Sequence, residues 1–129
     1  MSEALTIFIA DDDREMRSLL EASLRRGGFE VHLADSGDTL LAALDAATAS
    51  GQVPDLVITD VRMPGSDGLE VLRRIRRTLP TLPVILITAF GDRRTHERAR
   101  SLGATFVINK PFRLGAFRER VEAIVAAEH

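Results

Sequence analysis

The sequence contains no cysteine and only one lysine, and each shortage narrows what the chain can do. Without cysteine there is no disulfide framework and no thiolate metal site, which fits a reducing cytosol. Of the 17 basic residues, all but Lys110 are arginine, so this lone lysine calls for a specific explanation. The scarcity of lysine therefore singles out one candidate functional residue.

The sequence also lacks a long hydrophobic run. The apolar stretch at residues 5–10 has no basic leader before it and is too short for a signal core or a membrane span. A net charge of -2 gives no general attraction to nucleic acid or to an anionic membrane, and it favours a protein partner. We therefore expect a soluble cytoplasmic protein that binds neither nucleic acid nor membrane.

The length of 129 residues predicts one domain, spanning residues 1–129. Five apolar runs rich in β-branched residues predict strands, and helical spacing fills the segments between them. The predicted strands are 5–10, 31–34, 56–59, 84–88 and 105–108. Strict alternation of strand and helix predicts an α/β fold with a parallel sheet and helices on both faces, because each parallel return needs a right-handed crossover.

Two helices differ sharply in apolar content. The helix predicted at 92–102 offers little more than Ala99 and Leu102, so we expect it to be exposed and weakly packed. The C-terminal helix carries a stripe suited to burial, made of Leu114, Phe117, Val121 and Ile124.

Polar residues follow four of the predicted strands, at the edge where ligands bind in open α/β sheets. These residues are Asp11, Asp12 and Asp13, then Asp60, then Thr88, then Lys110. Each has an ordinary explanation when taken singly: Asp13 is placed to cap the first helix, and a lone Asp60 is more often a turn residue than a nucleophile. Their shared edge favours one phosphoryl site, in which we give Asp13 no catalytic role.

The acidic residues at this edge require a cation. Two carboxylates ~4 Å apart repel by roughly 4 kcal/mol at an effective dielectric near 20. Lys110 supplies one positive charge, and oxygen ligands without histidine or cysteine favour a hard ion. The sequence therefore predicts Mg²⁺ as the cofactor.

The chain resembles the CheY-like receiver domains of two-component response regulators along essentially its whole length. The matching motifs are Asp11-Asp12, Thr59-Asp60-Val61-Arg62-Met63-Pro64-Gly65 with Asp67-Gly68, Thr88-Ala89 and Lys110-Pro111-Phe112. The resemblance implies a flavodoxin-like (βα)5 doubly wound fold with strand order 2-1-3-4-5. It also implies a phosphoacceptor domain in phosphorelay signal transduction rather than an enzyme, one that catalyses only its own phosphorylation and dephosphorylation.

The resemblance assigns roles to particular residues. Asp60 would be the phosphoacceptor, phosphorylated by a histidine kinase, a phosphotransfer protein or a small phosphodonor. Asp12, Asp60 and the backbone carbonyl of Arg62 would bind the metal directly, and Asp11 would assist through water. A downstream protein or effector domain would read the phosphorylated state, and a homodimer through the fourth helix, fifth strand and fifth helix is a further expectation.

The phosphoryl oxygens would be contacted by Lys110, by the Thr88 hydroxyl and by the Ala89 amide. A compact ammonium acts as a point charge where a guanidinium imposes a planar fork, which would explain the lone lysine. The resemblance also implies a cis peptide between Lys110 and Pro111.

One position departs from the family pattern. Where the family usually has a switch tyrosine or phenylalanine, this chain has Val107, and its aromatic residue is the adjacent Phe106. Neighbours on a strand point to opposite faces, so the usual threonine–aromatic switch is in doubt. We expect activation to shift the loop at Phe90 and the fourth helix instead, starting from Thr88.

Two other classes of protein compete with this interpretation. A haloacid-dehalogenase-type phosphohydrolase would use Asp11 and Asp13, but Glu15 stands where such motifs have a small residue, and Asp60 would have no role. A receiver that only binds partners would not need an intact acceptor site.

Two further features have ordinary structural explanations. The arginine run at residues 73–77 flanks a buried stripe and is expected to form a solvated face. His96, without a second ligand at metal spacing, is expected to be exposed and without a role.

Overall fold

The computed structural model describes residues 4–89 and 92–128. Its strands are β1 (Thr6–Ala10), β2 (Glu30–Ala34), β3 (Leu56–Asp60), β4 (Val84–Ala89) and β5 (Phe106–Lys110). Its helices are α1 (Arg14–Arg26), α2 (Gly37–Ala49), α3 (Gly68–Thr78), α4 (Arg93–Ser101) and α5 (Leu114–Glu128). The predicted alternation of strand and helix is confirmed.

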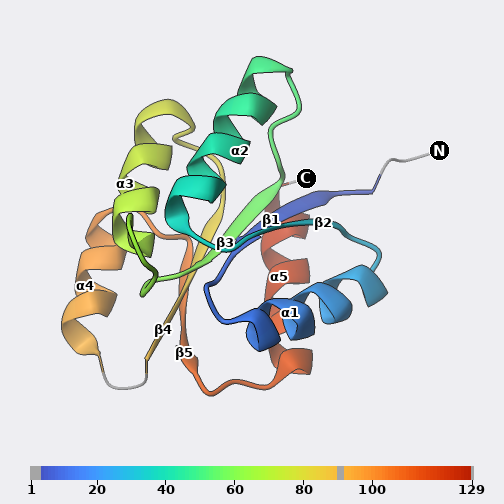
Figure 1. Cartoon of the computed structure of the whole chain (residues 1–129). Coiled ribbons are helices and arrows are strands. Elements are labelled where there is room, and N and C mark those ends of the chain that lie inside the picture. The colour runs from blue at the N-terminus through green and yellow to red at the C-terminus, as the bar shows by residue number, and fades with distance from the viewer. Residues whose placement is uncertain (1–3, 90–91, 129) are drawn as a thin grey trace.

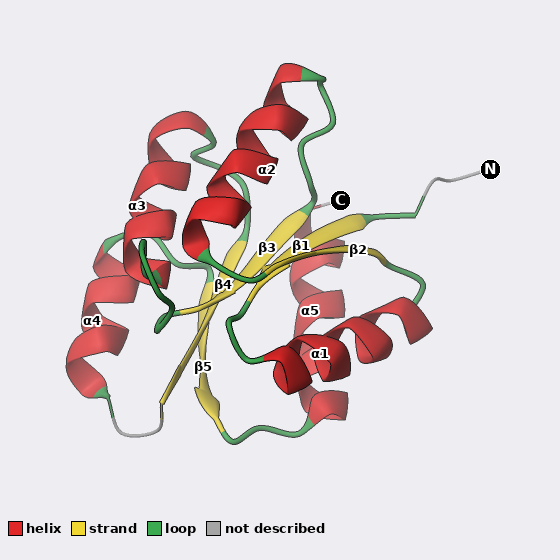
Figure 2. Cartoon of the chain, in the orientation of Figure 1, coloured by secondary structure: helices red, strands yellow, loops and turns green. Residues whose placement is uncertain are grey.

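The five strands form one parallel sheet in the order β2-β1-β3-β4-β5. Helices α2, α3 and α4 cover one face, and α1 and α5 cover the other (Figures 1 and 2). This is the doubly wound flavodoxin-like arrangement that the sequence predicts. Strand order reverses between β1 and β3, so the carboxyl ends of these two strands border the crevice where such sheets bind ligands.

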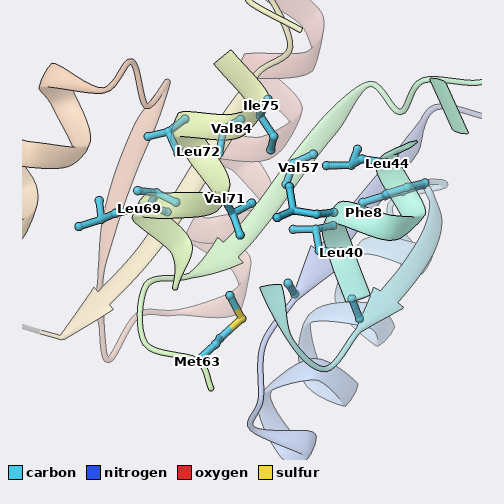
Figure 3. Packing of buried hydrophobic residues seen from close by; sticks show 14 of the residues in the cluster. Phe8, Leu40, Leu44, Val57, Met63, Leu69, Val71, Leu72, Ile75 and Val84 are labelled. Carbon is cyan, nitrogen blue, oxygen red and sulfur yellow. The ribbon is translucent and has the colours of Figure 1, made fainter. Parts of the chain in front are cut away.

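Alternating side chains divide the core between the two faces of the sheet. Phe8 and Val57 point toward α2 and α3, where they meet Leu40, Leu44, Val71 and Ile75 (Figure 3). Ile7, Ile9 and Ile58 point the other way and pack with Phe117 and Val121 of α5. Burial of both faces explains why the central strands are continuous apolar runs.

Helix caps account for several polar residues near the sheet edge. The Oδ1 atom of Asp13 accepts hydrogen bonds from the amides of Glu15 and Met16 at 3.0 and 3.2 Å, so its predicted capping role is confirmed. Asp67 caps α3 in the same way, accepting from the Glu70 amide at 2.9 Å. The acidic residues that remain at the edge are therefore not needed as caps.

The arginine run on α3 is not a uniformly solvated face, which corrects the expectation from the sequence. Arg76 is half-buried, and its guanidinium donates to three backbone carbonyls, those of Leu79, Leu82 and Gly103. These contacts tie α3 to the loops on either side of β4 and α4. Arg76 therefore satisfies loop carbonyls, a structural role, while its neighbours Arg73, Arg74 and Arg77 are exposed.

Helix α4 is weakly packed, as expected, because Ala99 is its one buried residue. The last strand differs from the prediction: β5 begins at Phe106 and runs on to Lys110, two residues beyond the apolar run. Asn109 and Lys110 extend it because they pair with the end of β4. No helix within residues 4–89 and 92–128 combines the length and apolar character needed to cross a membrane.

Candidate functional site

Strand alternation brings three charged residues to one side of the sheet edge. Asp11, Asp60 and Lys110 each stand two residues beyond an isoleucine that packs against α1 or α5. Their side chains therefore share a face. Carboxylate oxygens of Asp11, Asp12 and Asp60 lie within 4.8 Å of one another, so the predicted acidic cluster is present.

Asp60 is nearly buried and held at both carboxylate oxygens. Its Oδ1 accepts a hydrogen bond from the Arg62 amide at 3.1 Å, and its Oδ2 accepts one from Nζ of Lys110 at 2.5 Å. Although burial alone lowers the pKa of Lys110, the hydrogen bond and charge of Asp60 raise it above its usual value. Lys110 is therefore positively charged beside the Asp60 carboxylate, at the end of the strand that the sequence predicted it to follow.

Gly68 allows α3 to begin close behind Asp60. A Cβ atom at this position would lie 2.4 Å from the carbonyl oxygen of Asp60 and 2.8 Å from the Cα of Val61. No side chain fits there without moving the backbone at the end of β3. Gly68 was part of the matching motif, but its steric role emerges only from the packing of α3 on β3.

Asp11 is the most unusual group of the site. It has no exposed surface, and its Oδ1 accepts from the Asp13 amide at 2.9 Å. Its Oδ2 has no hydrogen-bond partner within the described residues, and Nζ of Lys110 is 3.9 Å away. Burial, reinforced by the charge of Asp60, raises the pKa of Asp11 to about 6.

These residues fit a divalent cation. A buried carboxylate oxygen without a partner is costly, and a hard cation would satisfy it together with the neighbouring carboxylates. Asp12, which is exposed, and Arg62 line one surface hollow beside the cluster, so two of the three residues expected to bind the metal directly border a common space. The ligands available are all oxygen atoms, as Mg²⁺ requires.

Thr88 and Ala89 end β4, the strand adjacent to that of Asp60. Thr88 is buried and pairs in register with Asn109, whereas Ala89 is exposed and pairs with Lys110. No side-chain hydrogen bond joins either residue to Asp60 or Lys110 among the described residues, so their expected contact with a phosphoryl group stays a prediction. The peptide between Lys110 and Pro111 is cis, as expected.

The two candidate switch positions on β5 point to opposite faces. Val107 packs against the α2–α4 side of the core, while Phe106 lies on the α5 side, with the Arg120 guanidinium 4.4 Å from its ring centre. The β4–β5 register is regular from Phe106 to Lys110, so no bulge turns Phe106 toward α4. The departure read from the sequence is therefore confirmed; Phe90, the other residue in that hypothesis, lies outside the described residues.

His96 corrects a second expectation. It is half-buried rather than exposed, and its Nε2 lies 2.5 Å from Oδ1 of Asn109 on β5. An amide oxygen only accepts, so Nε2 carries the proton. No sequence pattern indicated this contact, because it depends on the extension of β5 past its apolar run.

The pKa of Asp11 predicts how stability depends on pH. Between the ordinary pKa of 3.8 and about 6, the folded protein holds a proton that the unfolded chain has lost. Without metal, the contribution of Asp11 to stability should therefore be fully present below this range and be lost as the pH rises through about 6. Urea titrations across the range measure this fall, and Asp11→Asn should flatten it.

Added Mg²⁺ should offset the same fall, with more effect above about pH 6 than below it, since only the ionised carboxylate binds a cation. An equal gain at low and high pH, or an Asp11→Asn profile as steep as that of the wild type, would contradict the assignment of Asp11 as the titrating group.

Comparison with known proteins identifies the family of this chain independently of the site geometry. Residues 7–122 match the family profile of the response regulator receiver domain. The C4-dicarboxylate transport transcriptional regulatory protein DctD of Rhizobium meliloti is 41% identical over 112 residues, covering 87% of this chain and 23% of DctD. The transcriptional regulatory protein CpxR of Klebsiella pneumoniae is 37% identical over 123 residues, covering 95% of this chain and 50% of CpxR.

Among solved structures, the receiver domain of NtrX from Brucella abortus superposes with a TM-score of 0.83 at 32% identity, covering 93% of this chain and 98% of that domain. The present chain spans half or less of the length of the curated relatives DctD and CpxR. With the profile match over most of its length, the fold and the acidic edge together, the chain belongs to the receiver-domain family of two-component response regulators.

Proposed function

We propose that this receiver domain accepts one phosphoryl group on Asp60, with Mg²⁺ bound at the adjacent acidic cluster. The observation that carries the proposal is the environment of Asp60: its carboxylate is hydrogen-bonded to the sole lysine and lies beside buried Asp11, whose Oδ2 has no hydrogen-bond partner among the described residues. Such a carboxylate is positioned as a nucleophile, and the positive charge needed at the phosphoryl group is already next to it.

The reaction is an in-line displacement at phosphorus. A carboxylate oxygen of Asp60 forms the new P–O bond, while the bond from phosphorus to the nitrogen of a phosphohistidine, or to the acyl oxygen of acetyl phosphate, breaks. Lys110 follows the charge from the carboxylate to the phosphoryl oxygens, and the Thr88 hydroxyl and Ala89 amide donate to them. Bound Mg²⁺ would neutralise the charge that these oxygens carry in the transition state.

The partners we propose are a histidine kinase or a phosphotransfer protein as donor and a protein or effector domain as target. DctD and CpxR are transcriptional regulatory proteins in which the matched region is one part of a longer chain. For this chain we propose that a target protein or effector domain binds a face built from α4, β5 and α5. The same face would also form any homodimer. We place this activity in the cytoplasm and assign the domain no external substrate.

A phosphohydrolase of the haloacid-dehalogenase type is disfavoured by the geometry of the first loop. That chemistry would need Asp13 as the second acid, but the Asp13 carboxylate is engaged in capping α1. Asp11, the nucleophile in that scheme, is fully buried, whereas Asp60 is the carboxylate hydrogen-bonded to Lys110. A receiver that only binds partners would have no need for this contact.

Metal removal tests the proposal. Incubation with acetyl phosphate and Mg²⁺ should add one phosphoryl group per chain, seen by intact-mass measurement, and excess chelator should prevent it because the acidic cluster then lacks its cation. Restoring Mg²⁺ to the chelated sample is the control and should restore labelling. Equal labelling with chelator would show that the cluster is not a metal site that serves this transfer.

A further inference from the structure

Within the described residues, one side-chain hydrogen bond links helix α4 to the sheet. The bond from Nε2 of His96 to Oδ1 of Asn109 spans 2.5 Å and joins the middle of α4 to β5. Among the described residues it is the one side-chain hydrogen bond from α4 to another element, since Thr95 bonds only to the capping residue Asp92. This bond is therefore a specific tether on a helix that has few others.

Apolar packing adds little to hold α4 in place. Ala99 is its one buried residue, and an alanine side chain offers a single methyl group. The neighbouring Leu102 is half-buried, and Arg76 reaches the carbonyl of Gly103 just beyond the helix. These contacts hold the C-terminal end of α4, so the position of its middle and its N-terminal turn depends on His96.

The β5 end of the tether lies at the acceptor site. Asn109 precedes Lys110, whose ammonium binds Asp60, and it pairs in register with Thr88 at the end of β4. Side chains of register partners in a parallel sheet point to the same face, so Thr88 and Asn109 both face the α4 side, as Val107 does. A displacement of Thr88 or Lys110 should therefore also displace Asn109.

We propose that the His96–Asn109 hydrogen bond couples the state of Asp60 to the position of α4, an inference that rests on the proposed phosphorylation of Asp60. In the unphosphorylated protein the bond holds α4 against β5. A phosphoryl group on Asp60 redirects Lys110 and Thr88 toward its oxygens, Asn109 shifts with them, and the bond weakens. Helix α4 then moves to a second position, and the size of the shift is limited by the difference in free energy of this bond between the two states.

The test is amide hydrogen exchange of α4 in the wild type and in His96→Leu, with and without phosphorylation by acetyl phosphate. In the unphosphorylated variant the α4 amides should exchange about fivefold faster, as loss of one hydrogen bond predicts. Phosphorylation should accelerate these amides in the wild type and change them much less in the variant. Intact mass reports the phosphoryl content of each sample independently.

Four further variants separate coupling from general damage. Asn109→Leu and the double variant His96→Leu/Asn109→Leu should each match His96→Leu in α4 exchange, because all three lose the same bond. His96→Gln keeps a nitrogen donor and should restore part of the response. Arg94→Leu, at an exposed position on the same helix, should behave as the wild type.

The outcomes distinguish this inference from the proposed function. A wild type that takes up no phosphoryl group would overturn the phosphorylation of Asp60 and the coupling together. A wild type that is phosphorylated, while α4 in His96→Leu exchanges and responds as in the wild type, would overturn the coupling alone. Additive effects of the two leucine substitutions would also overturn it, since they would show that His96 and Asn109 act separately.

Discussion

Asp60→Asn is expected to abolish phosphorylation of this domain by acetyl phosphate. The amide is a far weaker nucleophile than the carboxylate, and it removes one of the negative charges that would bind Mg²⁺. The fold should survive, because asparagine has nearly the same shape and can still accept the hydrogen bond that Arg62 donates. Intact-mass measurement of the variant should therefore show no added phosphoryl group when the wild type is fully labelled.

Asp13→Asn is the matched control for this experiment. Asp13 lies near the same sheet edge, but its carboxylate caps α1, and asparagine is an equally good cap. This variant should be labelled like the wild type. Labelling of Asp60→Asn at the wild-type level would contradict the assignment of Asp60 as the acceptor.

Lys110→Met should slow phosphorylation by about 10²- to 10³-fold, the usual effect of removing one group aimed at developing charge. Methionine keeps the length of the side chain but leaves the Asp60 carboxylate and the incoming phosphoryl group without their ammonium partner. The rate of mass increase with acetyl phosphate at saturating Mg²⁺ measures the change. Arg113→Met, which removes an exposed cation from the following loop, should leave the rate unchanged.

Lys110→Arg asks whether charge alone is enough. Nζ of Lys110 lies 2.5 Å from Asp60 and 3.9 Å from Asp11, a space that suits a compact ammonium. A planar guanidinium needs more room and a different approach, so arginine should recover only a small part of the rate. Full activity in Lys110→Arg would leave the single lysine of the chain unexplained, and full activity in Lys110→Met would deny it a role in the transfer.

The sequence predicted the order of elements and the acidic edge because both depend on local patterns. Apolar runs, helical spacing and the polar residues after each run are visible without tertiary contacts. A parallel sheet then requires the ends of its strands to meet, which brings Asp11, Asp60 and Lys110 together. The same reasoning placed Asp13 as a cap and put Phe106 and Val107 on opposite faces.

The contacts that the sequence could not predict all depend on tertiary geometry. Residues 109 and 110 are polar, so the apolar pattern ended β5 too early, and only pairing with β4 extends it. Because the predicted strand ended before Asn109, the sequence pattern did not indicate a contact between His96 and Asn109. Arg76 looked like its exposed neighbours because its carbonyl partners lie in loops whose paths depend on the packing of α3 against β4 and α4.

Locating the phosphoryl group on the chain tests the central claim most directly. Reduction of the labelled protein with borohydride converts an aspartyl phosphate to homoserine, which peptide mass spectrometry assigns to one residue. The account predicts homoserine at position 60 alone, formed only when Mg²⁺ was present during labelling. Homoserine at Asp11 or Asp12, or at Asp60 after labelling with chelator, would contradict it.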